Sequence, residues 1–437
     1  MDVDLGVGVN VIIPMAGLGS RFTEYGFTEN KYLLPIDKYL TKMIEKAILT
    51  LNIKIPLTCF IFILREETGV NSKLRNYLKD ICIRHNYDCK ILSVPAVTEG
   101  PACTAYIAKE FINNDIPLIV SNSDQILDWN FESFYRQCSK YDGCVLTYTP
   151  DYELIIGSKD KNSFVRLDEN QMPIEFVEKT VISKEALVGV HYYKQGKHFI
   201  DACDYLFEHN IRAPNGEFYL SYTYQAMLDI GGYTLGTHRL SENEYFHPVG
   251  EPIDYFNYYN KNAPILMCDY ETANEFIRAA GLNLSFRLDF RLKNEELVCE
   301  NELVVTDKLH KGEKIHFKED TVFLRIIGID DEIDIDIRNY TRGWLIGDFE
   351  PNIKRVSEYE IGLLTHKKNE QWGFHYHRVA IEINVLVSGK MIINNQPIYA
   401  GDIFVFEPNV IACPIFSEEC KIICIKIPSR PSDKYII

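Results

Sequence analysis

Two positively charged residues, Arg21 and Lys31, lie close in sequence to a loop that contains Gly17 and Gly19. Glycine lets backbone N–H groups approach a phosphate chain closely, and the two side chains would add fixed positive charge at the same place. The loop follows an apolar run, 9–13, which is typical of a buried strand in a parallel sheet. A strand, a glycine-containing loop and two cations in this order predict a site for a nucleoside triphosphate.

Two better-known glycine loops do not fit this segment. The dinucleotide-binding loop needs a third glycine where this chain has Phe22. The P-loop needs a Gly-Lys-Ser/Thr tripeptide entering a helix, and that tripeptide is missing here. Gly-x-Gly after a strand is also compatible with an ordinary tight turn, so the two glycines alone do not decide the question.

The complete string is more specific than its glycines. Gly17 to Arg21 reads G-x-G-x-R and Lys31 to Pro35 reads K-x-L-x-P, which resembles the signature of the sugar-nucleotidyltransferase (sugar-1-phosphate pyrophosphorylase) family. The version from Pro14 to Arg21 is most similar to the bacterial UDP-glucose pyrophosphorylase and capsule-biosynthesis branches. The resemblance implies catalytic roles for Arg21 and Lys31. It also implies nucleotide binding by Ala16, Gly17, Gly19 and Ser20.

A later segment, 98–105, joins small residues to a glycine at the expected start of a helix. Small side chains let a flat base lie against the backbone, although a plain loop and helix start explains the composition equally well. In the resembled family this segment contacts the nucleobase. The resemblance therefore implies base contacts for Gly100, Ala102 and Thr104.

Asp124 follows the apolar strand expected at 117–122. A carboxylate at the carboxyl end of a strand can hold Mg²⁺ against a triphosphate, and a turn-forming aspartate is the alternative. The resemblance favours Asp124 as the magnesium ligand and as a nucleotide-binding residue. The family's second metal-binding aspartate corresponds to Pro248, which cannot bind a metal. Either His247, Glu251 or Asp254 substitutes for it, or Asp124 works with phosphates and water alone.

The segment 175–180 resembles the V-E-K-P element of the family, with Thr180 in place of proline. In the family the glutamate reads sugar hydroxyls and the lysine grips the sugar phosphate, which implies these roles for Glu178 and a catalytic role for Lys179. A Glu-Lys pair is otherwise usually a solvated surface pair. The resemblance adds Gly189 and Glu217 to the sugar site.

A second pattern lies near the C-terminus. His375 and His377 alternate on one expected strand and so share a face, and Glu382 follows within reach, which is a set of three metal ligands. The segment 358–428 resembles the cupin family, H-x-H-x4-E-x6-G followed by G-D-x-F-x-x-x-P. The family's fourth ligand falls at Ala412. A divalent metal (Zn, Fe, Mn or Ni) and a metal-free sugar-binding or dimerising barrel both remain open.

Length and composition limit the remaining choices. The chain has 437 residues, which indicates two or three domains, and its formal net charge of −16 disfavours nucleic acid or an anionic membrane as a partner. No apolar run is long enough to span a membrane, and we expect a cytoplasmic protein that forms a homo-oligomer. The twelve scattered cysteines indicate buried free thiols.

We predict an α/β Rossmann-like nucleotidyltransferase domain (1–262), a β-rich linking segment (263–345) and a cupin (double-stranded β-helix) barrel (346–437). Within the linking segment, the alternating acidic stretch 329–337 predicts a half-exposed strand rather than a calcium loop.

The implied reaction joins a nucleoside triphosphate, UTP or dTTP being favoured, to a sugar 1-phosphate. It gives a nucleotide sugar and pyrophosphate for glycan or capsule biosynthesis, with Mg²⁺ as cofactor. Two alternatives are a bifunctional enzyme whose cupin is a sugar isomerase or epimerase, and a non-catalytic nucleotide-sugar sensor.

Overall fold

The computed structural model describes residues 8–66, 70–281, 287–293, 296–306, 312–315, 322–327 and 339–437. They form two compact units, which interleave along the chain. Residues 8–23, 30–34 and 41–255 make the first, called here the α/β unit. The second unit, called here the β-rich unit, consists of the described residues within 24–29, 35–40 and 256–437.

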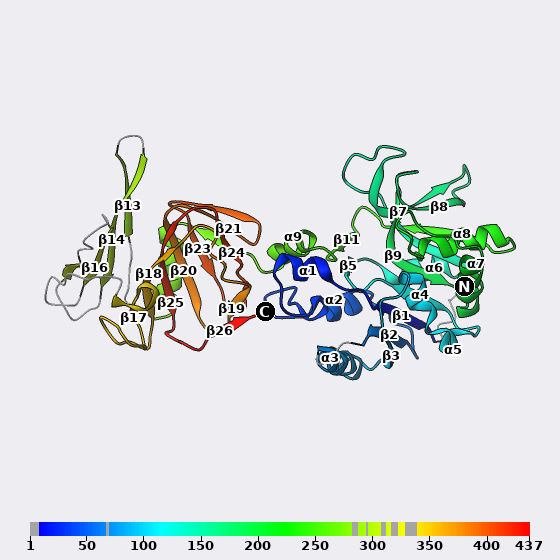
Figure 1. The fold of residues 1–437 in the computed structure, drawn as a ribbon, viewed down its shortest axis with the longest axis horizontal. Coiled ribbons are helices and arrows are strands. Elements are labelled where there is room, and N and C mark those ends of the chain that lie inside the picture. Colours follow the sequence, from blue (N-terminus) through cyan, green and yellow to red (C-terminus); the bar gives the residue numbers. More distant parts are fainter. Residues whose placement is uncertain are drawn as a thin grey trace. The chain divides into compact units, whose positions relative to one another are not determined.

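A nine-stranded sheet forms the centre of the α/β unit, and Figure 1 labels its strands β1, β2, β3 and β9. Seven of its strands follow the order β10-β6-β9-β4-β1-β2-β3. A hairpin of β7 and β8 extends from β9, and β5 pairs separately with β11. The strands are β1 (Asn10–Met15), β2 (Cys59–Arg65), β3 (Asp88–Val94), β4 (Leu118–Ser121), β5 (Gln125–Asp128), β6 (Gly143–Tyr148), β7 (Lys159–Leu167), β8 (Pro173–Thr180), β9 (Glu185–Tyr193), β10 (Leu235–Arg239) and β11 (Tyr245–Pro248).

Helices cover both faces of this sheet because its central strands are apolar on both sides. In β1, Val11 and Ile13 pack into one core, while Ile12 packs into the other. The first core contains apolar residues of α2, α3 and α6, and the second contains residues of α4, α7 and α8. The helices are α1 (Ser20–Tyr25), α2 (Met43–Thr50), α3 (Val70–Arg84), α4 (Pro101–Tyr106), α5 (Lys109–Ile112), α6 (Phe131–Cys138), α7 (Gly196–Glu208), α8 (Ser221–Ile230) and α9 (Pro252–Asn262), with a short 3₁₀ helix η1 (Lys31–Leu33).

The α/β prediction is confirmed, with two differences. Strand β9 runs antiparallel between β4 and β6, so the sheet is mixed rather than parallel. Successive antiparallel pairings, rather than a helical crossover, join β7, β8 and β9, and such pairings reverse the strand direction. The helix expected to start within 98–105 begins at Pro101, is interrupted after Tyr106 and continues as α5 from Lys109.

The β-rich unit contains a six-stranded sheet in the order β12-β23-β20-β25-β18-β17. A three-stranded sheet (β22-β21-β24), the pair β19–β26 and a four-stranded sheet (β13-β14-β16-β15) complete its described strands. The region is strand-rich, as predicted, and a cupin barrel stays a prediction. The strands are β12 (Leu266–Cys268), β13 (Arg287–Lys293), β14 (Glu296–Thr306), β15 (Gly312–Ile315), β16 (Val322–Ile327), β17 (Trp344–Ile346), β18 (Glu360–His366), β19 (His375–His377), β20 (Ile381–Ser388), β21 (Lys390–Ile393), β22 (Gln396–Tyr399), β23 (Ile403–Phe406), β24 (Pro414–Phe416), β25 (Cys420–Ile427) and β26 (Lys434–Ile436).

One helix, α10 (Tyr270–Ala279), was not predicted within this region. Its Ala273 and Ile277 pack on the face of the six-stranded sheet that also buries Ile383 and Ile425. The acidic stretch 329–337 lies outside the described residues.

Four aromatic residues of the β-rich unit come from distant parts of the chain. Phe27 stacks on Phe374 with ring centroids 3.7 Å apart and planes inclined by 11°. Phe256 and Tyr25 pack against the same pair. This aromatic cluster holds residues 24–29 in the β-rich unit, although residues 30–34, which follow directly, belong to the α/β unit.

None of the described helices is long and apolar enough to cross a membrane. Eleven of the twelve cysteines have described side chains, and these are free thiols; six of them are buried, as the sequence predicts, and five are partly exposed.

Candidate active site

A cavity of about 480 Å³ lies in the α/β unit, lined by the residues that follow β1 and β4 and by residues of β8, β9 and α4. This volume is in the range of small-molecule sites. Eleven of the predicted site residues line it, although they are scattered over 200 positions of the sequence. These are Ala16, Gly17, Arg21, Lys31, Gly100, Thr104, Asp124, Glu178, Lys179, Gly189 and Glu217.

Lys31 and Asp124 form the polar centre of this cavity. The Lys31 ammonium donates to Asp124 Oδ2 at 2.7 Å, and both side chains are largely buried. Asn30 fixes the 3₁₀ turn that carries Lys31, because its side-chain oxygen accepts from the Tyr32 amide at 3.0 Å. Burial alone would lower the pKa of Lys31, but the adjacent Asp124 carboxylate outweighs that effect and raises the pKa above its ordinary value. Lys31 is therefore a permanent cation here.

Close backbone packing positions Asp124. The Val249 amide donates to the Asp124 backbone oxygen at 3.0 Å. A Cβ on Gly250 would lie only 2.8 Å from Asp124 Oδ2, so this approach requires glycine. Pro248 lies opposite Gln125 in the β5–β11 pair and lines the cavity, at the position where a second metal ligand was expected.

The carboxylates expected to replace that ligand line the cavity too, but each already has a cationic partner. Glu251 Oε1 accepts from Arg21 Nη1 at 2.8 Å, and Asp254 Oδ2 accepts from Lys161 Nζ at 3.0 Å. The Arg21 side chain is 68% exposed, so its guanidinium remains accessible to a ligand.

Three predicted nucleotide-binding residues support the loops without lining the cavity. Gly19 has φ = +66°, a left-handed conformation that favours glycine, and it lies beside the Lys31 side chain. Ser20 begins α1. Ala102 is fully buried, and its amide donates to the Phe218 carbonyl at 3.1 Å.

The segment expected to contact the base has a structural requirement of its own. Gly100 has φ = +135°, and a Cβ there would lie 2.4 Å from the Phe218 carbonyl oxygen. The hydroxyl groups of Thr98 and Thr104 share a hydrogen bond of 2.5 Å beneath the loop. Gly100 is therefore needed for the close contact with the Phe218 backbone. Base binding by this segment stays a prediction.

The expected sugar-binding residues lie at another part of the cavity. The Glu178 carboxylate is buried and accepts hydrogen bonds from Ser221 at 2.7 Å and from Ser163. Burial raises the pKa of Glu178, while the two hydroxyl groups act in the opposite direction. Lys179 Nζ donates to the Tyr219 hydroxyl at 2.5 Å. Glu217 accepts from Asn215 and lines the same wall.

Among the buried polar residues of the cavity that sequence reasoning missed are Gln125 and His191. Gln125 Nε2 donates to the Gly189 carbonyl at 2.8 Å, but within the described part of the chain neither Gln125 Oε1 nor His191 Nδ1 has a hydrogen-bond partner. Burial lowers the pKa of His191 to about 3, so its imidazole is neutral. Only their positions in the sequence could have indicated these two residues. Gln125 directly follows Asp124, and His191 shares a strand face with Gly189.

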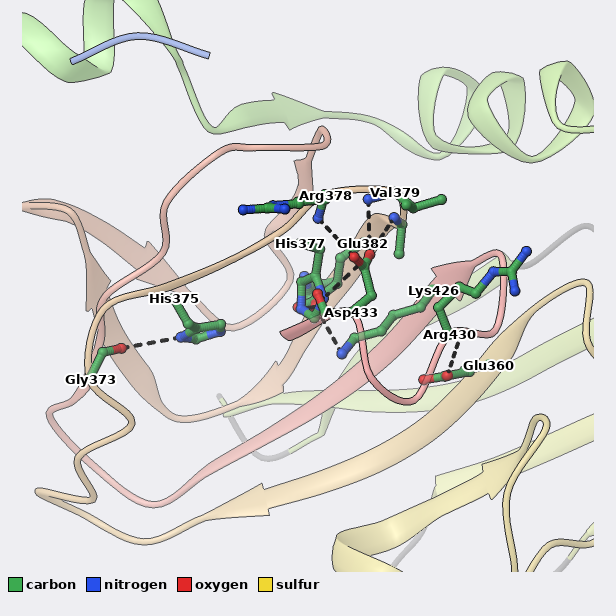
Figure 2. Close-up of polar contacts among 12 residues, drawn as sticks. Glu360, Gly373, His375, His377, Arg378, Val379, Glu382, Lys426, Arg430 and Asp433 are labelled. Carbon is green, nitrogen blue, oxygen red and sulfur yellow. Dashed lines mark hydrogen bonds and ion pairs between the residues drawn. The ribbon is translucent and has the colours of Figure 1, made fainter. Parts of the chain in front are cut away.

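The second predicted pattern lines a smaller cavity, of about 60 Å³, in the β-rich unit. His375 and His377 of β19 face this cavity together with Glu382 of β20, as their spacing predicts. His375 Nδ1 bonds to the Gly373 carbonyl at 3.1 Å and His377 Nδ1 to the Asp433 carbonyl at 2.7 Å (Figure 2). Burial lowers the pKa of His375 to about 4.

The residues present do not suit a divalent metal. Lys426 lies opposite Glu382 in the β20–β25 pairing, and its ammonium lies 3.4 Å from Glu382 Oε2 (Figure 2). Burial alone would raise the pKa of Glu382, but the Lys426 charge and the neighbouring histidines hold it well below its usual range. A dication beside Glu382 would have to displace this ammonium, and no second carboxylate from the part of the chain that the structure describes lines the cavity to offset its charge. Among the described residues, no three His, Cys, Asp or Glu side chains are arranged to bind a metal ion.

No protein-family model and no curated protein matches the chain. Solved structures similar to its N-terminal part are sugar nucleotidyltransferases. They include a nucleoside-diphosphate-sugar pyrophosphorylase from Vibrio cholerae RC9, with 21% identity, a TM-score of 0.48, and coverage of 57% of this chain and 99% of that one. An inositol-1-phosphate CTP transferase from T. maritima has 13% identity, a TM-score of 0.44, and coverage of 56% and 90%.

A UDP-glucose pyrophosphorylase complexed with UDP-glucose has 15% identity, a TM-score of 0.42, and coverage of 58% and 98%. These three structures have identities below 25% and TM-scores below 0.5, so any activity of this chain has to be inferred from the residues of its cavity.

Proposed function

We propose that the α/β unit is a sugar-1-phosphate nucleotidyltransferase, which joins a nucleoside triphosphate to a sugar 1-phosphate and releases pyrophosphate. The observation that carries the proposal is the Lys31–Asp124 pair at 2.7 Å, in a cavity that also contains Arg21, Glu178 and Lys179. Cations for phosphates, a carboxylate for magnesium and a separate polar wall for a sugar therefore share one cavity of suitable volume.

The proposed reaction is an in-line displacement at the α-phosphorus. A phosphate oxygen of the sugar 1-phosphate forms the new bond to that phosphorus, and the bond to pyrophosphate breaks as the bonding electrons leave with it. This chemistry needs positioning and charge neutralisation rather than a protein nucleophile. Lys31, a permanent cation, and the exposed Arg21 would balance the negative charge that develops on the phosphates.

Lys179 would orient the attacking sugar phosphate. Its ammonium is held by the Tyr219 hydroxyl, and the adjacent Glu178 carboxylate is fixed by two serine hydroxyls. A preorganised carboxylate of this kind accepts hydrogen bonds from sugar hydroxyls without first having to rearrange. The two residues would thus bind the two ends of one sugar phosphate.

Asp124 fits the Mg²⁺ that such a reaction requires, because one carboxylate together with substrate phosphates is a common magnesium ligand set. When bound, Mg²⁺ supplies further charge neutralisation at the phosphates. Asp124 is itself paired with Lys31, and a bound triphosphate would take over that ammonium and leave the carboxylate for the metal. We further propose that the triphosphate is UTP or dTTP. The protein would act in the cytoplasm and supply nucleotide sugars for surface glycans.

The test is pyrophosphate release by the purified full chain with Mg²⁺, each common nucleoside triphosphate and a panel of sugar 1-phosphates. We expect release with UTP or dTTP and one sugar 1-phosphate, and a strongly reduced rate from Asp124→Asn. Triphosphate binding by calorimetry without release from any pairing would instead favour a nucleotide-sugar sensor.

A further inference from the structure

The cavity of the β-rich unit has a composition that neither a metal site nor an apolar core explains. Its polar lining includes two lysines, Lys426 and Lys434, but a single carboxylate, Glu382. The remaining wall is formed by aromatic and aliphatic side chains that include Trp344 and Trp372. Apolar walls of this kind strengthen electrostatic interactions at the partly buried charges beside them, because less water screens those charges.

The charges inside this cavity do not balance. Lys426 is paired with Glu382 at 3.4 Å, which accounts for the one carboxylate. Lys434 lies over the Trp372 ring, 4.0 Å from its centroid, and no carboxylate of the described residues forms an ion pair with it. Because a partly buried ammonium without a counter-ion is costly, this arrangement favours an anionic ligand.

Strand positions hold the charges at the cavity. Lys434 lies opposite His377 in the β19–β26 pair, and Lys426 lies opposite Glu382 in the β20–β25 pair. The Asp433 carboxylate accepts from the amides of Arg378, Val379 and Ala380, which fixes the turn between β19 and β20 (Figure 2). The ammonium groups are thus carried by ordered strands rather than by flexible loops.

His375 adds a hydrogen-bond acceptor to the cavity. Since His375 Nδ1 donates to the Gly373 carbonyl, the neutral ring leaves Nε2 as an acceptor for a ligand hydroxyl. The volume of about 60 Å³ is enough for a small acidic group, because about 10–15 Å³ by the same measure already holds one water.

We propose that this cavity binds a small oxyanion, a carboxylate or a phosphate group, with Lys434 as its main partner and the Lys426–Glu382 pair in the place of a metal. The site lies in the β-rich unit and does not depend on the proposed transferase reaction. A free acid and the acidic group of a larger sugar derivative are two sources of the same chemistry.

Tryptophan fluorescence of the full chain can test the proposal. The chain has three tryptophans, and a Trp129→Phe background leaves the two that line the cavity, Trp344 and Trp372. Titration with acetate, inorganic phosphate, glucuronate and glucose 1-phosphate should give a saturable change with at least one of them. Binding of the simple ions indicates a free acid, whereas binding of only the sugar derivatives indicates a larger ligand.

Matched variants determine whether Lys434 is responsible. In the same background we expect Lys434→Gln to weaken binding at least tenfold, and Lys434→Arg and the exposed surface control Lys368→Gln to retain it. Unchanged affinity in Lys434→Gln, or no saturable change with any of the four probes, would overturn the proposal. So would a stoichiometric divalent metal that is lost in His375→Ala.

Discussion

The Lys31 ammonium lies 2.7 Å from Asp124 Oδ2, although 93 positions separate the two residues in the sequence. Lys31 follows the first strand of the sheet and Asp124 follows β4, which is its direct neighbour. Each charge neutralises the other in the free protein. Binding of a metal–triphosphate complex would therefore exchange this pair for new ones, in which Lys31 meets phosphate and Asp124 meets the metal.

Asp124→Asn should lower pyrophosphate release by about 10²–10³-fold, the usual cost of losing one electrostatic contact in a transition state. The amide keeps the size of the side chain but has no negative charge for Mg²⁺. Pyrophosphate release at saturating triphosphate measures the effect, and the melting temperature reports folding. Asp128→Asn, at the exposed end of β5 and four positions after Asp124, is the control and should stay close to wild type.

Glu178→Gln should raise the KM for the sugar 1-phosphate by about 10–100-fold, because hydrogen bonds to a charged acceptor contribute about 1.5–3 kcal/mol. Binding of the triphosphate, measured by calorimetry, should not change. Glu175→Gln is a matched control on the same strand, since Glu175 is paired with Arg166 at the surface. Equal effects of the two variants would contradict the role of Glu178.

Gly250→Ala should lower turnover by about 10–100-fold while the protein remains folded. The added methyl group would lie 2.8 Å from Asp124 Oδ2, so the carboxylate must shift, and misplacement on this scale is costly in catalysis. Steady-state kinetics with circular dichroism as the folding control measures this. Wild-type turnover would show that the position of Asp124 tolerates movement.

His191→Phe should make the α/β unit less sensitive to acid. Burial lowers the pKa of His191 from 6.5 to about 3, so the unfolded chain binds a proton between these values that the folded state does not. The contribution of the neutral His191 to the free energy of unfolding is fully present above pH 6.5 and is lost as the pH falls below that value. Between pH 7 and pH 5 the wild type should lose about 2 kcal/mol through it.

Urea unfolding at the two pH values, followed by a probe of the α/β unit, measures the difference between wild type and variant. The same pH dependence in both proteins would contradict the buried neutral state of His191.

The sequence predicted the local parts of this structure well. Gly17 and Arg21 of the G-x-G-x-R loop, Asp124 after its strand and the alternating His375 and His377 are each read from a few neighbouring residues, and in the structure they line cavities. Spacing of this kind survives folding because strand geometry fixes which side chains share a face.

Features that depend on pairing between distant strands could not be predicted. Nothing near Glu382 in the sequence indicates Lys426, which meets it only through the register of β20 and β25. The reversed direction of β9 and the unpartnered His191 likewise follow from the mixed sheet around them. Local periodicity specifies a face, but it does not specify the neighbour on that face.

The interleaving of the two units affects how this protein could be divided or recombined. A fragment ending at residue 262 would contain Phe27 and Phe256 but not Phe374, and would expose rings that are packed together in the full chain. Lys31 follows Phe27 by only four positions, so a break in the aromatic cluster falls beside the proposed catalytic loop. The C-terminal half is therefore not a module that a single crossover could exchange, and substitutions in the two halves are expected to be inherited together.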